Sequence, residues 1–476
     1  KLLSTGVPLF LRPNSIKPKK IRQIFTSAEA NKALKQFVQD SQSNQFIEEV
    51  SHRPVVSSPI LAIPKKAKNE WRIIIDLRYL NKFQTVPKFR NEDLRNLGLT
   101  VTPNCYMTVV DIKSGFFHAE ILKEHRDYLG FQFQNKYYRW RVMPMGSSSS
   151  PYIFAKLLRP VVEHLRKQGV KVQIYVDDII IAAPTRGQAV EHTALVVTTL
   201  QNLGFHLNWE KSQLTPSQTV EYLGMLIDSR GKPRLRVPAK KRRNVRHDVR
   251  RFLHQSEKGP IPIRHAARIA GLLNSLNRAI SITPIYIRKL LQIIPKNPDW
   301  DATVRVPQEV RGDLLSWLEI LNTWNGETIL EESPNAWMTT DASPIGWGAG
   351  LKIASKQWKA GSNWTNKKSQ MHINILELLA VEQSIQTFKA QLKNKVLSLK
   401  VDNTVTMAYL KRLTGRIPLL AEIAKHIILL CKEINLQLQV AYICTTENIT
   451  ADVISRMKDL HDWTVDDSIF QFLTKK

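Results

Sequence analysis

The spacing of apolar and polar residues changes character twice along the chain. Apolar residues recur at helical spacing over residues 27–50, and short strand-like runs begin at 59–75. Helical and strand patterns then alternate as far as Asp228, where a run containing glycine and proline, 229–233, follows. Such a run is typical of a turn between elements. We therefore expect a first part of mixed helices and strands that ends near residue 232.

Two further patterns fill the rest of the chain. Between about 234 and 330 the apolar spacing is helical, as in Val245, Val249 and Phe252. After a turn signal at 333–335 a strand and hairpin pattern begins, and helix and strand then alternate. The sequence predicts an α+β protein with an N-terminal arm at 1–25, a mixed domain at 26–232, a helical domain at 233–332, an α/β domain at 333–457 and a tail at 458–476.

Two adjacent acids, Asp177 and Asp178, stand between two apolar β-branched runs. A hairpin turn is the ordinary interpretation, but such turns favour Asn-Gly or Asp-Gly, and like charges near a core are unfavourable without a counter-ion. Asp111 ends another β-branched run and supplies a third carboxylate. Hard divalent cations prefer carboxylate oxygens, and a pair of them can promote phosphoryl transfer. The pattern favours a metal-dependent phosphoryl or nucleotidyl transfer site.

The sequence offers few other ways to hold a phosphate or a metal. No Gly-x-x-x-x-Gly-Lys-Ser/Thr loop occurs. A triphosphate would then be held by metals and by cationic side chains, for which the candidates are Lys65, Lys66 and Arg72. The three cysteines form no Cys-x-x-Cys pair, which excludes a structural zinc site or a disulfide framework. Any metal would therefore be held by oxygen.

Four acids of the α/β domain, Asp341, Glu377, Asp402 and Asp452, each stand at the start or end of an expected element. Each has an ordinary explanation. Glu377 could complete a helix cap begun by Asn374, Asp402 could be an N-cap, and Asp452 could favour a helix dipole. Four acids that converge on two cations would instead hydrolyse a phosphodiester.

The overall charge implies an anionic partner. Lys and Arg number 69 against 41 Asp and Glu, which gives +28, and nucleic acid, an anionic membrane surface or an acidic protein could each balance it. The hydrophobic fraction of 43% is ordinary for a globular protein. No run approaches the roughly 18 to 20 apolar residues of a membrane span. We expect a soluble intracellular protein, in the cytoplasm or nucleus, and the initial Lys suggests a piece of a longer polypeptide.

A dense share of this charge lies between residues 230 and 251. Arg243, Arg246 and Arg250 fall on one helical stripe, and apolar residues fall on another. One face of this helix is expected to pack and the other to track phosphates. A solvated charge run or a nuclear-localisation signal would have a similar composition.

The order of the motifs resembles that of reverse transcriptases. The motifs are Trp71 to Lys82, the strand ending at Asp111, Met143 to Phe154, Tyr175 to Asp178, Gly204 to Lys211 and Glu221 to Gly224. The resemblance implies a right-hand polymerase with fingers, palm and thumb. It also implies that Asp111, Asp177 and Asp178, with the backbone of Ile112, hold two Mg²⁺ or Mn²⁺ ions.

The same resemblance assigns further roles. It implies that Lys65 and Arg72 contact the incoming triphosphate, and that Phe116 excludes the ribose 2′-OH, so the substrates would be dNTPs. Met145 stands where retroviral enzymes carry a glutamine that touches the sugar. The remaining implied residues are Lys211 as a proton donor to pyrophosphate, Tyr222 and Gly224 in a primer grip, and Arg243, Arg246 and Arg250 on the thumb as duplex contacts.

The α/β domain resembles ribonuclease H. The order Asp341, Glu377, Asp402, Asp452 implies a second site with two cations, and Tyr442 stands where many relatives have histidine. Met371 to Val381, Ser398 to Thr404 and Asp459 to Trp463 resemble DIRS-type retrotransposons.

We therefore expect a retrotransposon enzyme that copies an RNA or DNA template from a DNA primer and cleaves RNA in RNA–DNA hybrids. Two alternatives are an inactive homologue that serves as an RNA-binding scaffold and an RNA-synthesising polymerase. The oligomeric state is not encoded in these patterns.

Overall fold

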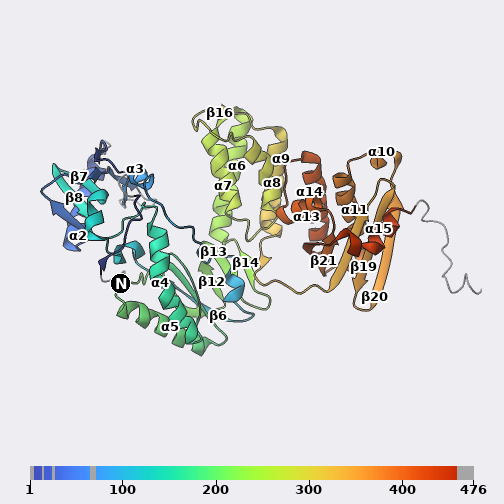
Figure 1. The fold of residues 1–476 in the computed structure, drawn as a ribbon, viewed down its shortest axis with the longest axis horizontal. Helices are drawn as coiled ribbons and strands as arrows, with labels where there is room; N and C mark the ends of the chain where they lie inside the picture. Colours follow the sequence, from blue (N-terminus) through green and yellow to red (C-terminus); the bar gives the residue numbers. More distant parts are fainter. Residues whose placement is uncertain (1–4, 13–15, 24–26, 65–70, 458–476) are drawn as a thin grey trace, which may run out of the picture. The chain divides into compact units, whose positions relative to one another are not determined.

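The computed structural model describes residues 5–12, 16–23, 27–64 and 71–457. The chain forms two compact units, one of Lys1–Leu235 with Thr328–Leu330 and one of Arg236–Glu327 with Glu331–Lys476 (Figure 1). The helical region and the C-terminal α/β region thus belong to one compact unit. No helix in the described residues has the length and apolar content that crossing a membrane requires.

The core of the first unit is an antiparallel four-stranded sheet. Its order is β11 (Gln213–Ser217), β6 (Tyr106–Asp111), β10 (Asp178–Ala183), β9 (Lys171–Tyr175). Helix α4 (Ser150–Lys167) packs on β9, and α5 (Arg186–Asn202) packs on β10, β6 and β11. The apolar β-branched residues of β6 and β10 are buried between sheet and helices, which explains why these strands are hydrophobic on both faces.

A second sheet precedes and flanks this one in the first unit. Its order is β1 (Lys19–Lys20), β3 (Val56–Ser57), β7 (Gly130–Phe133), β8 (Lys136–Trp140), β2 (Ile47–Val50). A separate hairpin pairs β4 (Ile60–Pro64) with β5 (Trp71–Ile75). The short elements here are α3 (Arg78–Asn81), η1 (Leu97–Leu99), η2 (Gly115–His118) and η3 (Lys123–Leu129).

The helix expected over 27–50 is shorter than its pattern. Helix α2 (Ala28–Ser43) begins after the Ser27 cap and ends before Gln45, whose φ is +56°. The residues that follow form β2 and pair with β8. Cross-strand pairing therefore overrides the helical spacing in the last part of this segment.

The last hairpin of the first unit joins β12 (Thr219–Tyr222) to β13 (Met225–Asp228). Its two turn residues, Leu223 and Gly224, both have positive φ, 49° and 68°. Two-residue turns of this kind suit the twist of a hairpin. The chain then passes through β14 (Arg234–Arg236) toward the second unit.

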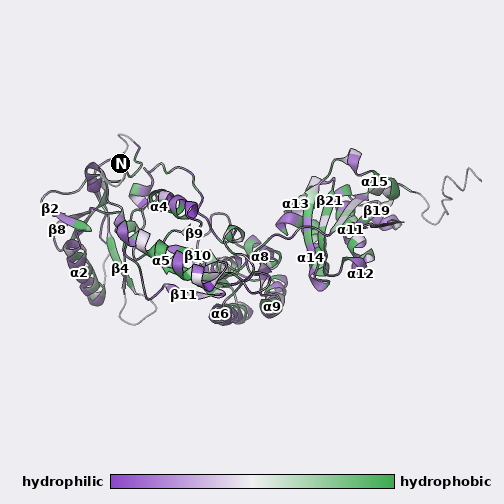
Figure 2. Ribbon diagram, turned by 90° about the horizontal axis from the view of Figure 1, so that it is seen from below, coloured by the Kyte–Doolittle hydropathy of each residue, from purple (hydrophilic) through white to green (hydrophobic). Residues whose placement is uncertain are grey.

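The second unit begins with four helices that run side by side (Figure 1). They are α6 (Ala239–Lys258), α7 (Ile263–Asn274), α8 (Thr283–Gln292) and α9 (Gln308–Thr323), with short strands β15 (Ile261–Pro262), β16 (Thr303–Val304) and β17 (Glu327–Thr328) between or after them. Val245, Val249 and Phe252 of α6 are buried, as the spacing predicts. Much of the rest of α6 is hydrophilic (Figure 2).

The C-terminal part of this unit is built on a five-stranded sheet. Its order is β20 (Lys356–Asn363), β19 (Gly346–Ile353), β18 (Ala336–Ala342), β21 (Val396–Val401), β22 (Gln437–Tyr442), and β18, β21 and β22 run parallel. Helices α11 (Ile373–Thr387) and α15 (Ile449–Ser455) both contact β18 and β19. The other elements are α10 (Asn366–Ser369), α12 (Lys389–Leu392), α13 (Thr404–Arg412), α14 (Pro418–Glu433) and η4 (Thr445–Glu447).

Two glycines allow α15 to approach the sheet closely. A Cβ atom at Gly348 would lie 2.3 Å from the carbonyl oxygen of Ala451, and one at Gly361 would lie 2.4 Å from the Ile454 side chain. Any larger residue at either position would push the helix away. The acid carried by α15, Asp452, is thereby held beside the strands.

Candidate active sites

Three acids of the first unit lie at one end of its four-stranded sheet. Asp178 pairs with Asp111 across β10 and β6. Asp177 lies in the β9–β10 turn, and its carbonyl oxygen accepts a hydrogen bond of 2.9 Å from the backbone N–H of Ile112. The turn requires a positive φ of 55° at Val176. The pairing of two strands that are distant in sequence thus brings these carboxylates together.

The electrostatics of this end of the sheet suit a cation. Burial, together with the charges of Asp111 and Asp178, raises the pKa of Asp177 to about 6. Burial and Asp111 also raise the pKa of Asp178, whereas the charge of Lys211 lowers both values. Among the described residues, Oδ1 of Asp177 is a buried oxygen with no hydrogen-bond partner. Buried, mutually repelling carboxylates with an unsatisfied oxygen fit a divalent cation.

Gly115 has a role that the sequence did not predict. A Cβ atom at this position would lie 2.2 Å from Asp177 Oδ1 and 2.5 Å from the Phe154 ring. Gly115 opens the turn η2, and Phe116 in this turn packs edge-to-face on Phe154, with ring centroids 5.6 Å apart. The aromatic ring implied to exclude the 2′-OH is therefore fixed directly beside the acids.

Of the other residues expected near the triphosphate, the structure describes Arg72 and Met145. Lys65 lies outside the described residues. Arg72 on β5 is exposed, and no hydrogen bond or ion pair joins it to the three acids in the described part of the chain. Met145 is 47% exposed, beside a turn that Asn81 holds through the carbonyl of Gly146.

A buried side chain of the β12–β13 hairpin contacts the backbone of Asp178. Tyr222 is 2% exposed, and its hydroxyl lies 3.5 Å from the carbonyl oxygen of Asp178. Burial raises the pKa of Tyr222. Tyr222 therefore supports the hairpin from beneath, whereas Gly224 at the turn is exposed.

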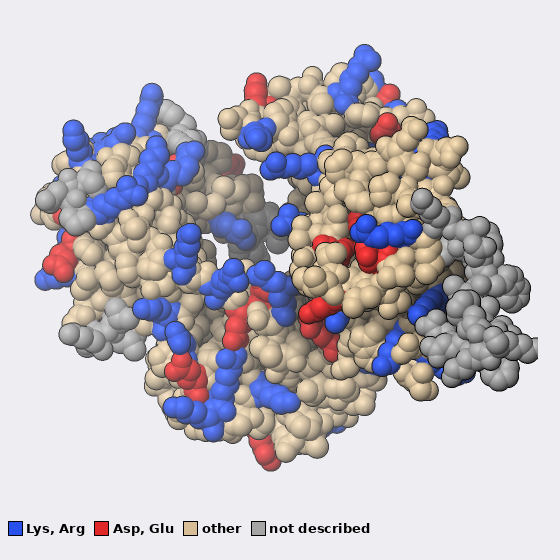
Figure 3. All heavy atoms as spheres, turned by 45° about the vertical axis from the view of Figure 1, so that its right-hand side comes forward, with Lys and Arg blue, Asp and Glu red and all other residues tan. Residues whose placement is uncertain are grey.

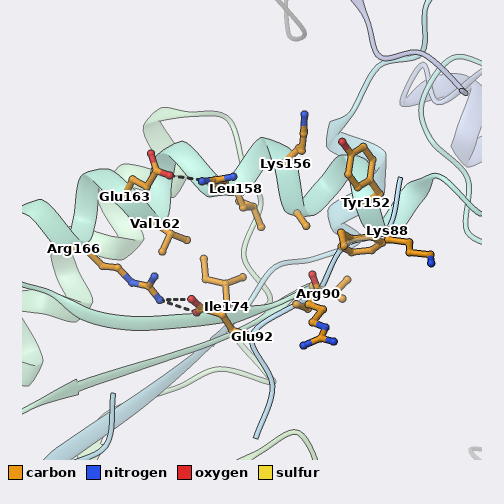
Figure 4. Close-up of a pocket in the computed structure, with 15 residues that line it drawn as sticks. Lys88, Arg90, Glu92, Tyr152, Lys156, Leu158, Val162, Glu163, Arg166 and Ile174 are labelled. Carbon is orange, nitrogen blue, oxygen red and sulfur yellow. Dashed lines mark hydrogen bonds and ion pairs between the residues drawn. The ribbon is translucent and has the colours of Figure 1, made fainter. Parts of the chain in front are cut away.

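A pocket of about 550 Å³ borders the β9–β10 turn, because Val176 lines it. Among its lining residues, Arg166 of α4 and Glu92 form an ion pair of 2.7 Å (Figure 4). The floor includes the aromatic pair Phe89 and Tyr152, whose ring centroids are 5.4 Å apart. Further cations, all among the lining residues, are Lys88, Arg90, Lys156 and Arg159. The pocket offers both positive charge and aromatic surface.

Helix α6 presents the basic face that its sequence predicts. Six side chains line an open hollow on it: Arg243, Arg246, His247, Arg250, Arg251 and His254. The opposite side of the helix is buried against the other helices. Figure 3 shows Lys and Arg outnumbering Asp and Glu on the face in view.

The second set of acids is more tightly gathered. One carboxylate oxygen from each of Asp341 on β18, Glu377 on α11 and Asp402 after β21 lies within 4.8 Å of the other two. Asp341 and Glu377 are 4% and 5% exposed. The negative charge of Asp452 on α15 helps to raise the pKa of Asp341, and Asp452 forms an ion pair of 2.7 Å with Arg456. In the described residues no other set of three such side chains is so close.

Burial makes these carboxylates unfavourable as free anions. Burial is the main cause that raises the pKa of Glu377 to about 9, and the charges of Asp341 and Asp402 contribute to this rise. It also raises the pKa of Asp341 to about 6, against a hydrogen bond from Ser455. Oε2 of Glu377 is buried without a hydrogen-bond partner in the part that the structure describes. The donor set fits an oxygen-ligated divalent cation.

Two of the three ordinary explanations for these acids are wrong. Helix α11 is capped by His372, whose Nδ1 accepts from the N–H of Asn374, so Glu377 completes no cap. Helix α13 is capped by Asn403 and not by Asp402. Asp452 does lie in the first turn of α15.

Comparison with known proteins identifies part of the chain. Residues 63–227 match the family described as reverse transcriptase (RNA-dependent DNA polymerase). The chain is 24% identical to the Pro-Pol polyprotein of feline foamy virus over 338 residues, which are 70% of this chain and 27% of the polyprotein. It is 23% identical to a putative enzymatic polyprotein of cassava vein mosaic virus over 442 residues, 89% of this chain and 64% of that one.

Solved structures show the same fold. The structure of a foamy viral protease–reverse transcriptase bound to double-stranded DNA matches 91% of this chain and 74% of its own chain. The TM-score is 0.60 and the sequence identity is 17%. The same enzyme with an RNA/DNA hybrid covers 96%, with 59% of its own chain matched, a TM-score of 0.58 and 18% identity. This protein therefore carries a reverse transcriptase domain within a multi-domain α+β fold. It spans about a quarter of the feline foamy virus polyprotein.

Proposed function

We propose that this protein is an RNA-directed DNA polymerase that extends a DNA primer with dNTPs and that also cleaves the RNA of RNA–DNA hybrids. The observation that supports the first activity best is the pairing of Asp111 with Asp178 next to Asp177, inside the segment that matches reverse transcriptases. The second activity rests on the close triad of Asp341, Glu377 and Asp402.

The residues of the polymerase site have distinct roles in this proposal. Asp111, Asp177 and Asp178, with the backbone of Ile112, would hold two Mg²⁺ or Mn²⁺ ions. When bound, such ions activate the attacking 3′-hydroxyl and stabilise the leaving oxygen. Phe116 would reject ribonucleotides by contact with the 2′-OH, because Phe154 prevents its ring from retreating.

Lys211 is the proton donor that we propose for the pyrophosphate. Its positive charge lowers the pKa of both Asp177 and Asp178, which supports this role. Arg72 and Met145 would complete the nucleotide site, and Lys65 is proposed from sequence alone.

The nucleic-acid substrates would bind to the basic surfaces. The pocket beside Val176 is lined by both cations and an aromatic pair, and phosphates and bases require these two kinds of contact. Lys88 and Arg90 make no ion pair in the described part of the chain, so they are available to phosphates. Arg243, Arg246 and Arg250 would contact the duplex without regard to sequence.

The nuclease site would hold its cations through Asp341, Glu377, Asp402 and Asp452. Its buried carboxylates repel one another in the absence of a cation, and a bound divalent cation would offset this repulsion. Arg456 would orient Asp452 through their ion pair. A role in retrotransposon replication, and membership of the DIRS-type group, are proposed from the sequence motifs alone.

Primer extension tests the proposal. The full chain would be incubated with an RNA template, a DNA primer and dNTPs in Mg²⁺, next to Asp177→Ala and Asp402→Ala. We expect Asp177→Ala to abolish extension and spare hybrid cleavage, and Asp402→Ala to do the reverse. Binding of the hybrid without either activity would show an inactive RNA-binding scaffold instead.

A further inference from the structure

Two hydroxyl groups contact the acids of the second site, and neither has a role in the proposal above. Ser455 Oγ lies 2.6 Å from Oδ2 of Asp341, and Thr445 Oγ1 lies 3.0 Å from Oδ2 of Asp402. Ser455 ends α15, and Thr445 begins η4, the turn that joins β22 to α15. One C-terminal segment thus contacts two acids that stand on other elements.

The contact of Ser455 is buried and has a defined direction. Ser455 is 0% exposed and Asp341 is 4% exposed. An ionised carboxylate only accepts hydrogen bonds, so the serine hydroxyl must donate. Ser455 Oγ also lies 2.8 Å from the carbonyl of Asp452, but a charged oxygen is the stronger acceptor for its single proton.

The backbone holds Ser455 in this position. Its carbonyl oxygen accepts a hydrogen bond of 2.5 Å from Ser343 Oγ, and Ser343 directly follows β18. The close packing of α15 over Gly348 and Gly361 fixes the same helix against the sheet. Ser455 is therefore attached twice to the strand end that carries Asp341. It occupies one carboxylate oxygen and leaves the other for a cation.

Thr445 makes the corresponding contact on the more open side. Asp402 is only half-buried, and Thr445 is exposed. Tyr442 of β22, which occupies the position expected for histidine, pairs with Val401 of β21 and is 51% exposed. Within the described residues, no hydrogen bond or ion pair joins Tyr442 to the four acids. The side chain that contacts an acid of the second site from this part of the chain is therefore Thr445 and not Tyr442.

We propose that Ser455 and Thr445 are positioning residues of the nuclease metal site. Each holds one oxygen of an acid and thereby directs the other oxygen toward the cation. This inference rests on the proposed nuclease function. Partners behind metal ligands typically change metal affinity or activity by 10- to 100-fold. The buried Ser455 contact belongs to the upper part of that range, and the exposed Thr445 contact to the lower part.

Mn²⁺ binding to the full chain tests the inference. Both variants, Ser455→Ala and Thr445→Val, would be made in a chain whose polymerase acids are changed by Asp177→Asn and Asp178→Asn, so that calorimetry reports the second site. Ser384→Ala is the matched control for Ser455, because Ser384 is equally buried and its Oγ donates only to the carbonyl of Ala380. Thr446→Val is the control for Thr445.

We expect Ser455→Ala to raise the Mn²⁺ dissociation constant by roughly 100-fold and Thr445→Val by about 10-fold, with both controls unchanged. Thr445→Ser, which keeps the hydroxyl, should restore affinity. If Mn²⁺ binds the parent and both variants within twofold, the positioning role is refuted. If the parent binds no Mn²⁺, or if Glu377→Gln in the parent leaves Mn²⁺ binding unchanged, the proposed nuclease function itself is refuted. Should Ser455→Ala not fold, the comparison of Thr445→Val with Thr445→Ser decides the question.

Discussion

Replacement of Gly115 by alanine should disable the polymerase site without disturbing the nuclease. The new Cβ would lie 2.2 Å from Asp177 Oδ1 and within 2.9 Å of two Phe154 ring atoms. A carbon–oxygen contact needs a little over 3 Å, so the carboxylate must move by about 1 Å. A displacement of this size at a reacting centre costs on the order of 100-fold in rate. Crowding of the buried ring adds roughly 1–3 kcal/mol of destabilisation.

Single-nucleotide primer extension and hybrid cleavage would be measured on the same preparation. Gly187→Ala is the control, because Gly187 lies in α5 of the same unit and a Cβ there would meet no atom within 4 Å. We expect extension by Gly115→Ala to fall about 100-fold, cleavage to stay at the wild-type rate, and Gly187→Ala to behave as wild type. Wild-type extension by Gly115→Ala would refute the argument that this contact fixes Asp177.

Three further outcomes can be checked. Phe116→Ala should raise ribonucleotide incorporation relative to dNTPs at least tenfold, measured as the ratio of the two extension efficiencies; an unchanged ratio would exclude the steric role. Changing Arg243, Arg246 and Arg250 to alanine should lower the slope of log affinity against log salt by about 3 for duplex DNA; an unchanged slope would contradict duplex contact. Without metal, Glu377→Gln should be more stable than wild type at pH 8. The raised pKa of Glu377 in the folded state makes the wild-type protein lose stability as pH rises from about 4.5 to 9. Equal thermal unfolding midpoints of the two proteins at pH 8 would contradict this prediction.

The elements that carry the acids could be predicted because local pattern and tertiary structure agree there. Asp111 and Asp178 end or begin strands that are buried on both faces, so their β-branched runs are continuous and easy to find. The packing stripe of α6 follows helical spacing for the same reason.

Features that depend on distant contacts could not be predicted. The contact of Gly115 with Phe154 joins residues 39 positions apart, and Ser455 donates to an acid 114 positions away. The end of α2 depends on pairing of β2 with β8. Two caps were also misassigned. Asn403 competes with Asp402, a neighbour of similar capping propensity, and His372 caps α11 although histidine is not a preferred capping residue.

The two acid sets differ in a way that should separate the two activities by pH. Without a cation the pKa of Glu377 is about 9, whereas that of Asp177 is about 6. A ligand must lose its proton to bind metal, so each pH unit below its pKa weakens metal binding up to tenfold. Between pH 8.0 and 6.5 the nuclease site should therefore lose up to about 30-fold in apparent Mg²⁺ affinity, while the polymerase site changes little. Half-saturating Mg²⁺ for hybrid cleavage and primer extension, measured at both pH values, gives the comparison. Parallel shifts in the two activities would mean that burial of Glu377 does not control metal binding at the nuclease site.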